Sequence, residues 1–314
     1  MEVNPELIRA LTGGQFVESA CSTDTASIYN LTECYWAGRS PFCDIVIAES
    51  PEYGKVLFLD KEIQSAESDE AIYHEHLVHP ALNALADRSG KRVLIVGGGE
   101  GATAREVLKW SSVAAVDWVD IDHYLVDLCR RHLSWADDPV YNDPRLRYFG
   151  EDIRTFWASN TDLYDLIVLD LPDPDVEDLC AGTMEDDGDY ALYSPRFFQV
   201  LRSHLTTDGV FVSHCGPVAP GGDPALRRAG LEWIRTQSTA IGFNTGAAYH
   251  TFIPSFQSQW GFFMSTCPSD AAQYPSGLAV MDLDAQTHAF SWPAFWNSPY
   301  LGHAQRLRAA LRLD

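Results

Sequence analysis

The stretch VLIVGGGEGATAREVL, from Val93 to Leu108, gives the strongest indication of the fold. An apolar run is followed by glycines and then by a segment with helical spacing, which predicts a buried strand, a turn and a helix. Gly97, Gly99 and Gly101 follow the pattern G-x-G-x-G, which is typical of turns that carry a nucleotide-like ligand. The pattern alone leaves a phosphate, a dinucleotide or an S-adenosyl compound open.

Glu100, in the middle of this turn, narrows the choice among these ligands. No Lys-Ser or Lys-Thr pair follows the glycines, so the turn is not a P-loop. A dinucleotide would bring its pyrophosphate to the helix N-terminus, where the carboxylate of Glu100 would repel it. A cationic ligand has the opposite preference, so Glu100 favours an adenosyl sulfonium compound.

Strands and helices continue to alternate after the glycine turn, which predicts a mostly parallel sheet with helices on both faces. Asp120 ends the second strand, Asp152 follows the third and Asp170 ends the fourth. Ligands of such sheets bind at the carboxyl ends of the strands. We expect Asp120 to accept hydrogen bonds from ribose and Asp152 from an adenine amino group. Each acid taken alone could equally cap a helix.

The N-terminal part of the sequence has a different pattern. Between Ser27 and Asp60, polar and apolar residues alternate and turn residues separate the runs, which predicts three strands. The stretch SDEAIYHEHLVHPALNAL, which begins at Ser68, then has helical spacing. We therefore predict a small antiparallel β domain over residues 1–62 and an α/β domain over residues 63–314.

Composition excludes several classes of protein. The formal net charge is −22, which disfavours nucleic acid and favours a cationic partner. The sequence has no apolar run long enough to span a membrane and no signal peptide, so we expect no membrane association and a cytoplasmic location. Seven cysteines without a C-x-x-C pair predict free thiols. His74, His76 and His79 lack the carboxylates that would complete a ligand set, so no metal is expected.

The segment LDLPDP places Asp170 at the end of a strand and Asp173 just beyond it. Two carboxylates near a bound cation can hold a diamine and take a proton from its attacking nitrogen. A turn rich in Asp and Pro is the structural alternative. Nine of the twenty residues from Asp170 to Asp189 are acidic, which suits an acceptor with two or more positive charges.

Several motifs in a fixed order resemble one enzyme family, the polyamine aminopropyltransferases (spermidine, spermine and thermospermine synthases). The resemblance covers about Asp44 to Thr266 and is most similar to the thermospermine synthase branch. The motifs are YGKVLFLDKEIQSAESDEAIYHEHLVHPAL, VLIVGGGEGATAREVLK, VDID, GED, DLIVLDLPDP, LYSPRFF and IPSFQSQWGF. The fold that this implies is α/β, with a Rossmann-like, mostly parallel sheet of the class I methyltransferase type and a small N-terminal antiparallel β domain.

The resemblance implies transfer of an aminopropyl group from decarboxylated S-adenosylmethionine, the co-substrate, to a polyamine, with methylthioadenosine as by-product. Asp170 would deprotonate the attacking nitrogen and Tyr73 would orient it. Glu100 would face the primary ammonium of the donor. Intact S-adenosylmethionine carries a carboxylate on that arm, which Glu100 would repel.

The resemblance also implies the remaining site residues. On the donor side these are Gln64, His74, Gly97, Gly99, Gly101, Asp120, Asp152 and Ile153. On the acceptor side they are Asp173, Tyr249, His214 and Trp260, the last as a wall for the methylene chain. Members of the family are commonly oligomers, so a homo-oligomer (a dimer or a tetramer) is expected.

Two positions depart from the family pattern. Cys43 stands where a donor-contacting Gln is usual, and His214 stands where a Gln often faces the pocket. No cationic residue flanks Cys43, so we interpret it as a packed thiol. His214 is either a pH-sensitive element or, as we favour, a neutral hydrogen-bonding substitute for Gln.

Two other functions stay open at this point. A methyltransferase that uses intact S-adenosylmethionine would have the same fold, and Cys43 and His214 motivate it, whereas Glu100 opposes it. A non-catalytic polyamine-binding protein is the second alternative, although Asp170, Asp173 and Tyr73 are all present.

Overall fold

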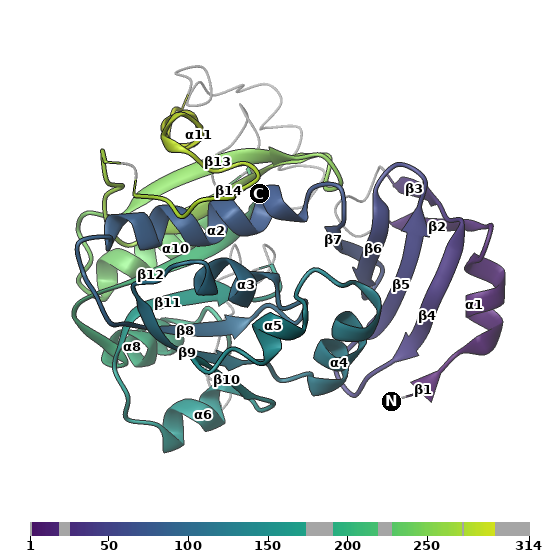
Figure 1. Cartoon of the computed structure of the whole chain (residues 1–314), viewed down its shortest axis with the longest axis horizontal. Coiled ribbons are helices and arrows are strands. Elements are labelled where there is room, and N and C mark those ends of the chain that lie inside the picture. Colours follow the sequence, from purple (N-terminus) through teal and green to yellow (C-terminus); the bar gives the residue numbers. More distant parts are fainter. Residues whose placement is uncertain (1, 19–25, 174–190, 219–227, 272, 293–314) are drawn as a thin grey trace, which may run out of the picture.

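The computed structural model describes residues 2–18, 26–173, 191–218, 228–271 and 273–292. Figure 1 shows a small N-terminal sheet, coloured purple to blue, beside a larger unit of strands and helices. Most of the acidic stretch that follows Asp173 lies outside the described residues. Within the described residues, no helix is both long enough and apolar enough to cross a membrane.

The N-terminal unit is an antiparallel sheet with the strand order β1-β4-β5-β6-β7. Helix α1 (Pro5–Leu11) packs against β4, and β2 and β3 form a separate two-stranded ribbon. The strands are β1 (Glu2–Val3), β2 (Gln15–Glu18), β3 (Ser27–Asn30), β4 (Glu33–Arg39), β5 (Asp44–Ser50), β6 (Gly54–Leu59) and β7 (Glu62–Ala66).

Two details of this unit differ from the sequence-based expectation. The pattern predicts a single strand where the chain forms β3 and β4, which belong to different sheets. Strand β7 pairs with β6, so the small sheet continues to Ala66, past the domain boundary predicted at residue 62. The turn between these strands uses Asp60 and Lys61 at positive φ angles of 47° and 74°. Without a glycine there, the sequence carries only a weak turn signal.

The larger unit is a seven-stranded sheet with the order β10-β9-β8-β11-β12-β14-β13. The first five strands in this order are parallel, and β14 and β13 continue the sheet in antiparallel pairing. The strands are β8 (Lys91–Gly97), β9 (Val113–Val119), β10 (Leu146–Phe149), β11 (Tyr164–Asp170), β12 (Leu205–Pro217), β13 (Ala247–Ile253) and β14 (Ser258–Met264). The predicted α/β fold with a mostly parallel sheet is confirmed.

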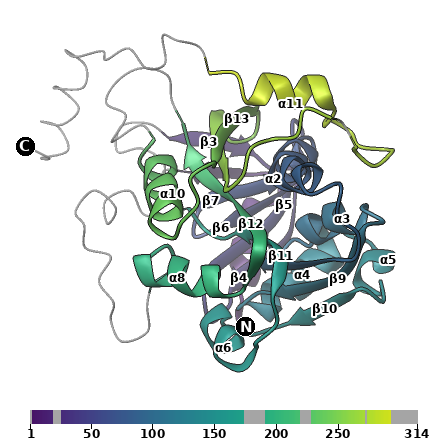
Figure 2. The same ribbon diagram turned by 90° about the vertical axis from the view of Figure 1, so that its left-hand side faces the viewer.

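Helices cover both faces of this sheet because alternate residues of its buried strands point to opposite sides. Val93 and Ile95 of β8 pack with α2 and α3, whereas Leu94 and Val96 face the layer of α6, α8 and α10. Figure 2 shows α2 and α10 on opposite sides of the sheet. The helices are α2 (Glu70–Ala84), α3 (Ala102–Leu108), α4 (His123–His132), α5 (Asp138–Tyr141), α6 (Ile153–Ser159), α8 (Pro195–Ser203), α10 (Ala229–Ala240) and α11 (Leu283–Ala289).

The two units share an apolar interface. Trp36, Ile45 and Leu57 of the small sheet pack in one cluster with Ala102 of α3 and Leu125 of α4. Figure 1 shows α4 beside β4 and β5. The small sheet therefore lies against the helices that follow the first two strands of the large sheet, on the side where the glycine turn lies.

Candidate active site

The strand order places a switch point between β8 and β11. From β8, the chain proceeds outward through β9 to β10, and the next strand, β11, lies on the other side of β8. Loops diverge at such a point, which leaves room for a ligand at the carboxyl ends of the strands. In register, Gly97 at the end of β8 lies beside Asp170 at the end of β11. The glycine turn and the predicted base are therefore neighbours.

The glycine turn has no space for a side chain at Gly97 or Gly98. Gly97 and Gly98 have φ angles of 84° and 71°, which other residues rarely adopt. A Cβ on Gly97 would lie 2.1 Å from the carbonyl oxygen of Asp170, and one on Gly98 would lie 2.7 Å from the Asp170 carboxylate. Gly97 was predicted as a site residue but Gly98 was not, although the run of three glycines from residue 97 was the visible signal.

The carboxylate of Asp170 accepts a hydrogen bond on each oxygen. The hydroxyl of Tyr73 donates to Oδ1 at 2.8 Å, and that of Thr103 donates to Oδ2 at 2.5 Å. Burial, followed by the charge of Asp170, raises the pKa of Tyr73 well above its ordinary value, so its hydroxyl keeps its proton. The structure thus brings the predicted pair Asp170 and Tyr73 together. Thr103, which the sequence analysis missed, lies two residues after the glycine turn on α3.

Glu100 and His74 complete a compact group with Asp170. The side-chain ligand atoms of these three residues all lie within 4.8 Å of one another. Burial and the charge of Asp170 raise the pKa of Glu100 to about 7. Burial also raises the pKa of Asp120 to about 7, with the charges of Asp122 and Glu100 as further causes. Ionised carboxylates are thus costly here, and a bound cation would relieve that cost.

His74 is held from behind by Glu70. The Nδ1 atom of His74 lies 2.7 Å from the carbonyl oxygen and 3.1 Å from the carboxylate of Glu70, so this nitrogen carries the hydrogen. Arg105 fixes that carboxylate with two hydrogen bonds of 2.9 and 2.7 Å. Burial alone would lower the pKa of His74, but Glu70 raises it to about 9. Neither Glu70 nor Arg105 was named by the sequence analysis.

The two predicted adenosine contacts differ in their surroundings. Asp120 is buried, and its carboxylate accepts the backbone N–H of Asp122 at 2.8 Å. Asp152 is the N-cap of α6 and binds the guanidinium of Arg154 at 2.5 Å, which lowers its pKa. Ile153 is buried in the core beneath it. Asp152 thus has the capping role that was the alternative, which leaves its adenine contact a prediction.

A second group of predicted residues lies beyond the end of β11. The Nδ1 atom of His214 is 3.4 Å from the carboxylate of Asp173. The ring of His214 stacks on Trp260, with centroids 6.2 Å apart, and lies 6.0 Å from that of Tyr73. Phe256, which the sequence analysis did not name, contacts both Trp260 and Tyr73. These aromatic faces and Asp173 suit an amine with a methylene chain.

Gln64 and Tyr249 lie at the margin of this arrangement. Gln64 is half-buried on β7, the strand that also carries Glu62. The pKa of Glu62 is raised by burial and by the charge of Asp173, so this strand is electrostatically coupled to the acceptor side. Tyr249 is fully buried, stacks on Phe262 and donates to the carbonyl oxygen of His76 at 2.9 Å. It has no exposed surface here, and its substrate contact stays a prediction.

Among the described residues, two groups of side chains have the geometry to hold a metal ion. The first is His74, Glu100 and Asp170, and the second is Glu75, His79 and Glu106. In the second group, both ring nitrogens of His79 are engaged, by Glu106 and by the indole of Trp110, at 2.9 Å each. The carboxylate of Glu75 accepts three backbone N–H groups from residues 279–281. The second group is therefore satisfied without an ion.

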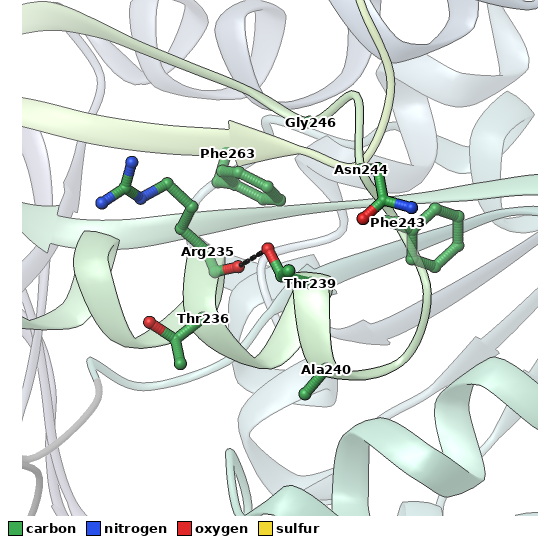
Figure 3. Close-up of a pocket in the computed structure, with 8 residues that line it drawn as sticks. All are labelled: Arg235, Thr236, Thr239, Ala240, Phe243, Asn244, Gly246 and Phe263. Carbon is green, nitrogen blue, oxygen red and sulfur yellow. Dashed lines mark hydrogen bonds between the residues drawn. The ribbon is translucent and has the colours of Figure 1, made fainter.

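A surface groove lies elsewhere on the described part of the protein. It has a volume of about 550 Å³ and lies between α10 and the β13–β14 pair, where Arg235, Phe243 and Phe263 form part of its lining (Figure 3). Phe263 pairs with Ser213 in the middle of β12, whereas Trp260 pairs with Pro217 at the end of β12 that carries the candidate site. The groove is therefore separate from the carboxylates described above.

The fold and the candidate site together indicate the class of protein to which this chain belongs. A parallel sheet extended by an antiparallel pair, with a glycine turn and strand-end acids, is the arrangement of S-adenosyl-dependent transferases of the class I methyltransferase type. Two solved structures support the fold. Spermidine synthase from Thermotoga maritima has a TM-score of 0.72 and 20% identity, covering 96% of this chain and 95% of that chain. A spermidine synthase in complex with the transition state analogue AdoDATO has the same TM-score and identity, covering 100% and 97%.

The sequence comparisons identify the family. Residues 70–273 match the spermine/spermidine synthase domain, and residues 19–67 match the spermidine synthase tetramerisation domain. The chain belongs to the spermine/spermidine synthase family, a family of transferases, as its motifs predict.

Curated relatives carry the corresponding names. Polyamine aminopropyltransferase 2 of Pseudomonas aeruginosa is 38% identical over 240 residues, which are 76% of this chain and 64% of the relative. Polyamine aminopropyltransferase of Aeropyrum pernix is 35% identical over 248 residues, covering 79% and 73%. A thermospermine synthase of Arabidopsis thaliana is 35% identical over 257 residues, covering 79% and 69%. The prediction of an aminopropyltransferase is confirmed at the level of the family.

Proposed function

We propose that this protein transfers the aminopropyl group of decarboxylated S-adenosylmethionine to an amine of a polyamine and releases methylthioadenosine. One observation carries the proposal most directly. Glu100 and Asp170 lie together at the switch point, and the charges of both act on Asp120. Within the described part of the chain, none of these three acids forms an ion pair with a lysine or arginine. His74 supplies one positive charge to this group, and a sulfonium donor with a primary ammonium would supply the further positive charge that the remaining carboxylates need.

The donor fits the glycine turn with its ammonium toward Glu100 and its ribose toward Asp120. Asp152 and Ile153 lie after the next strand, where an adenine ring would reach them. His74, fixed by Glu70, faces the same carboxylates from α2. Intact S-adenosylmethionine would bring a second carboxylate into this acidic group, which like-charge repulsion disfavours.

The acceptor fits the aromatic residues on the other side of Asp170. Asp173 would bind an ammonium of the polyamine, and Trp260 and Phe256 would pack on its methylene groups. The reacting nitrogen, protonated in water, would transfer its proton to Asp170 and attack the carbon next to the sulfonium. The new C–N bond would form as the C–S bond breaks, and its electron pair would remain on the sulfur of methylthioadenosine. Tyr73 would hold Asp170 in place through its hydrogen bond.

A donor competition tests the reaction. Purified protein would be incubated with putrescine, spermidine and agmatine and with either the decarboxylated or the intact donor, and the nucleoside product would be read by mass spectrometry. Methylthioadenosine made only from the decarboxylated donor is expected, and the amine product would name the acceptor. S-adenosylhomocysteine would instead support the methyltransferase, and binding without turnover would support a polyamine-binding protein.

Asp170→Asn tests the proposed base. We expect kcat to fall by about 10²–10⁴-fold, the usual contribution of a general base, with little change in donor affinity. Asp165→Asn is the matched control, because Asp165 lies near the other end of β11 and accepts the backbone N–H of Arg92. Turnover by Asp170→Asn at the wild-type rate would contradict the assignment of the base.

The wider setting of the protein is part of the same proposal. The match to a tetramerisation domain supports a homo-oligomer, a dimer or a tetramer. We further propose a cytoplasmic location, without membrane or nucleic acid partners and without a metal cofactor. The net charge of −22 supports cationic rather than anionic partners.

A further inference from the structure

The hydrogen bonds of His214 determine which of its ring nitrogens carries a proton. The side chain is buried on β12, and its Nε2 atom lies within hydrogen-bonding distance of the carbonyl oxygen of Leu171. A carbonyl oxygen only accepts, so Nε2 must donate. In the neutral ring, Nδ1 is then an acceptor.

That Nδ1 atom is buried without a hydrogen-bond partner among the described residues. It lies 3.4 Å from Oδ1 of Asp173. Two acceptors that face each other at this distance repel, unless one of them is protonated and donates to the other. The pair therefore needs one proton, either on the ring or on the carboxyl group, while no cation is bound.

Among the described residues, no other source of positive charge is recorded around the pair. Within the described ranges, the titratable groups that interact with Asp173 besides His214 include Glu62 of β7, Tyr73 of α2, Tyr193 before α8 and Cys215 of β12. None of these groups is cationic. In the described ranges, His214 is the only side chain that forms an ion pair with Asp173.

The two members of the pair differ in their access to solvent. The side chain of Asp173 is 39% exposed, whereas that of His214 is 3% exposed. An incoming ammonium can therefore reach Asp173 but not Nδ1. Nearby protein still raises the pKa of Asp173 by desolvation, and His214 partly offsets this effect.

We infer that His214 is a positioning residue that shares one proton with Asp173 in the empty acceptor site, and that this proton is released when a cationic amine binds Asp173. This inference rests on the proposed function, in which Asp173 binds the acceptor. The ammonium replaces the shared proton as the positive partner of the carboxylate, and the proton leaves to solvent. A glutamine at this position could donate an N–H to Asp173 but could not store a proton.

Calorimetry tests the inference. Spermidine would be titrated into the full-length protein saturated with methylthioadenosine, at equal pH in two buffers that differ in ionisation enthalpy, from about pH 6 to about pH 8. The difference in heat gives the number of protons released. We expect His214→Gln to release about one proton fewer than the wild type at the acidic end. His288→Gln, on the exposed end of α11, is the control and should match the wild type.

Steady-state kinetics give the second readout. The KM for spermidine should rise as the pH falls in the wild type, and this rise should be smaller in His214→Gln. kcat at saturating spermidine should change little. A merely structural role would shift kcat and KM together at every pH.

The outcomes separate this inference from the proposed function. Equal proton release in the wild type and in His214→Gln, with active enzyme in both, would overturn the inference alone. Failure of the wild type to make methylthioadenosine from the decarboxylated donor would overturn the proposed function. If His214→Gln does not fold, the calorimetry of the wild type alone still tests the inference. A wild type that releases no proton on binding spermidine between about pH 6 and about pH 8 would contradict a shared proton.

Discussion

Helix α2 contributes histidines to two clusters of similar chemistry and opposite charge balance. His74 faces the glycine turn, close to Glu100 and Asp170. His79 lies further along the helix and binds the buried carboxylate of Glu106 at 2.9 Å. Glu106 also binds Arg105 and Lys109, each at 2.7 Å, so its charge is fully compensated.

The pKa values of the carboxylates follow this difference. Burial alone would raise the pKa of Glu106, but His79, Arg105 and Lys109 lower it to about 2. Glu100 and Asp120 are also shielded from solvent, but no lysine or arginine of the described residues forms an ion pair with them. His74 only partly offsets the effect of burial at Glu100, and both carboxylates reach pKa values of about 7. A buried carboxylate whose charge is only partly balanced by cationic side chains indicates a place where a cationic ligand binds. The shortage of cationic side chains beside buried carboxylates therefore identifies the site better than the presence of acidic residues does.

The largest effect is expected in the compensated cluster. Glu106→Gln removes the negative charge that His79, Arg105 and Lys109 surround. Because this leaves buried cationic groups without their partner, we expect the free energy of unfolding to fall by about 3–5 kcal/mol. Urea denaturation at pH 7 measures the change. Glu232→Gln is the control, because its ion pair with Arg235 is at the surface of α10 and should contribute less than about 1 kcal/mol.

The pH dependence of Glu106→Gln gives an independent check. Because the pKa of Glu106 is lowered from 4.5 to about 2, its contribution is present above about pH 4.5 and is lost as the pH falls toward 2. The variant should therefore lose less stability than the wild type over this acidic range. If Glu106→Gln has the same unfolding free energy as the wild type at pH 7, then His79, Arg105 and Lys109 do not stabilise the charge of Glu106 in the folded protein.

A smaller effect of opposite sign is expected at the uncompensated cluster. The pKa of Glu100 is raised to about 7, so its favourable contribution is present below about pH 4.5 and is lost as the pH rises through 7. Glu100→Gln should therefore increase the unfolding free energy of the ligand-free protein by about 1–2 kcal/mol at pH 8, with little change at low pH.

The same variant should bind the decarboxylated donor more weakly. Calorimetry of donor binding measures this loss, and urea denaturation at both ends of the pH range measures the gain in stability. Glu151→Gln is the control, because Glu151 also follows a strand of the large sheet. A loss of stability at pH 8 would show that Glu100 is compensated after all.

The fold was largely predictable because its strands are continuous apolar runs and its helices begin near Asp, Ser or Gly. The runs around Val93 and Ile167 are buried on both faces, which makes their pattern clear. The small domain was predicted to end at residue 62, whereas β7 continues to Ala66 after a turn that Asp60 and Lys61 form without a glycine. Asp alone is only a weak local signal for such a turn.

The site was predictable where function constrains the residue type at a strand end. Asp170 and Tyr73 are 97 positions apart, and only the family resemblance, not spacing, pointed to their contact. Thr103 and Phe256 were missed because their roles depend on tertiary contacts with Asp170 and Trp260. The burial of Tyr249 behind Phe262 likewise depends on the packing of β13 and β14 on α2, which no local pattern encodes.

The smallest effect is expected at Cys43, which lies between the small sheet and the acidic site. Its thiol donates weakly to Asp122 at 3.8 Å, and burial followed by nearby acids raises its pKa to about 12. Without a cation to stabilise the thiolate, roughly one thiol in 10⁴ is ionised near pH 8. Iodoacetamide should therefore label Cys43 far more slowly than the exposed Cys267, as peptide mass spectrometry would measure, and Cys43→Ser should keep kcat within about two-fold. Rapid labelling of Cys43 with loss of turnover would mean that a cationic group reaches this side of the site, and it would favour the methyltransferase.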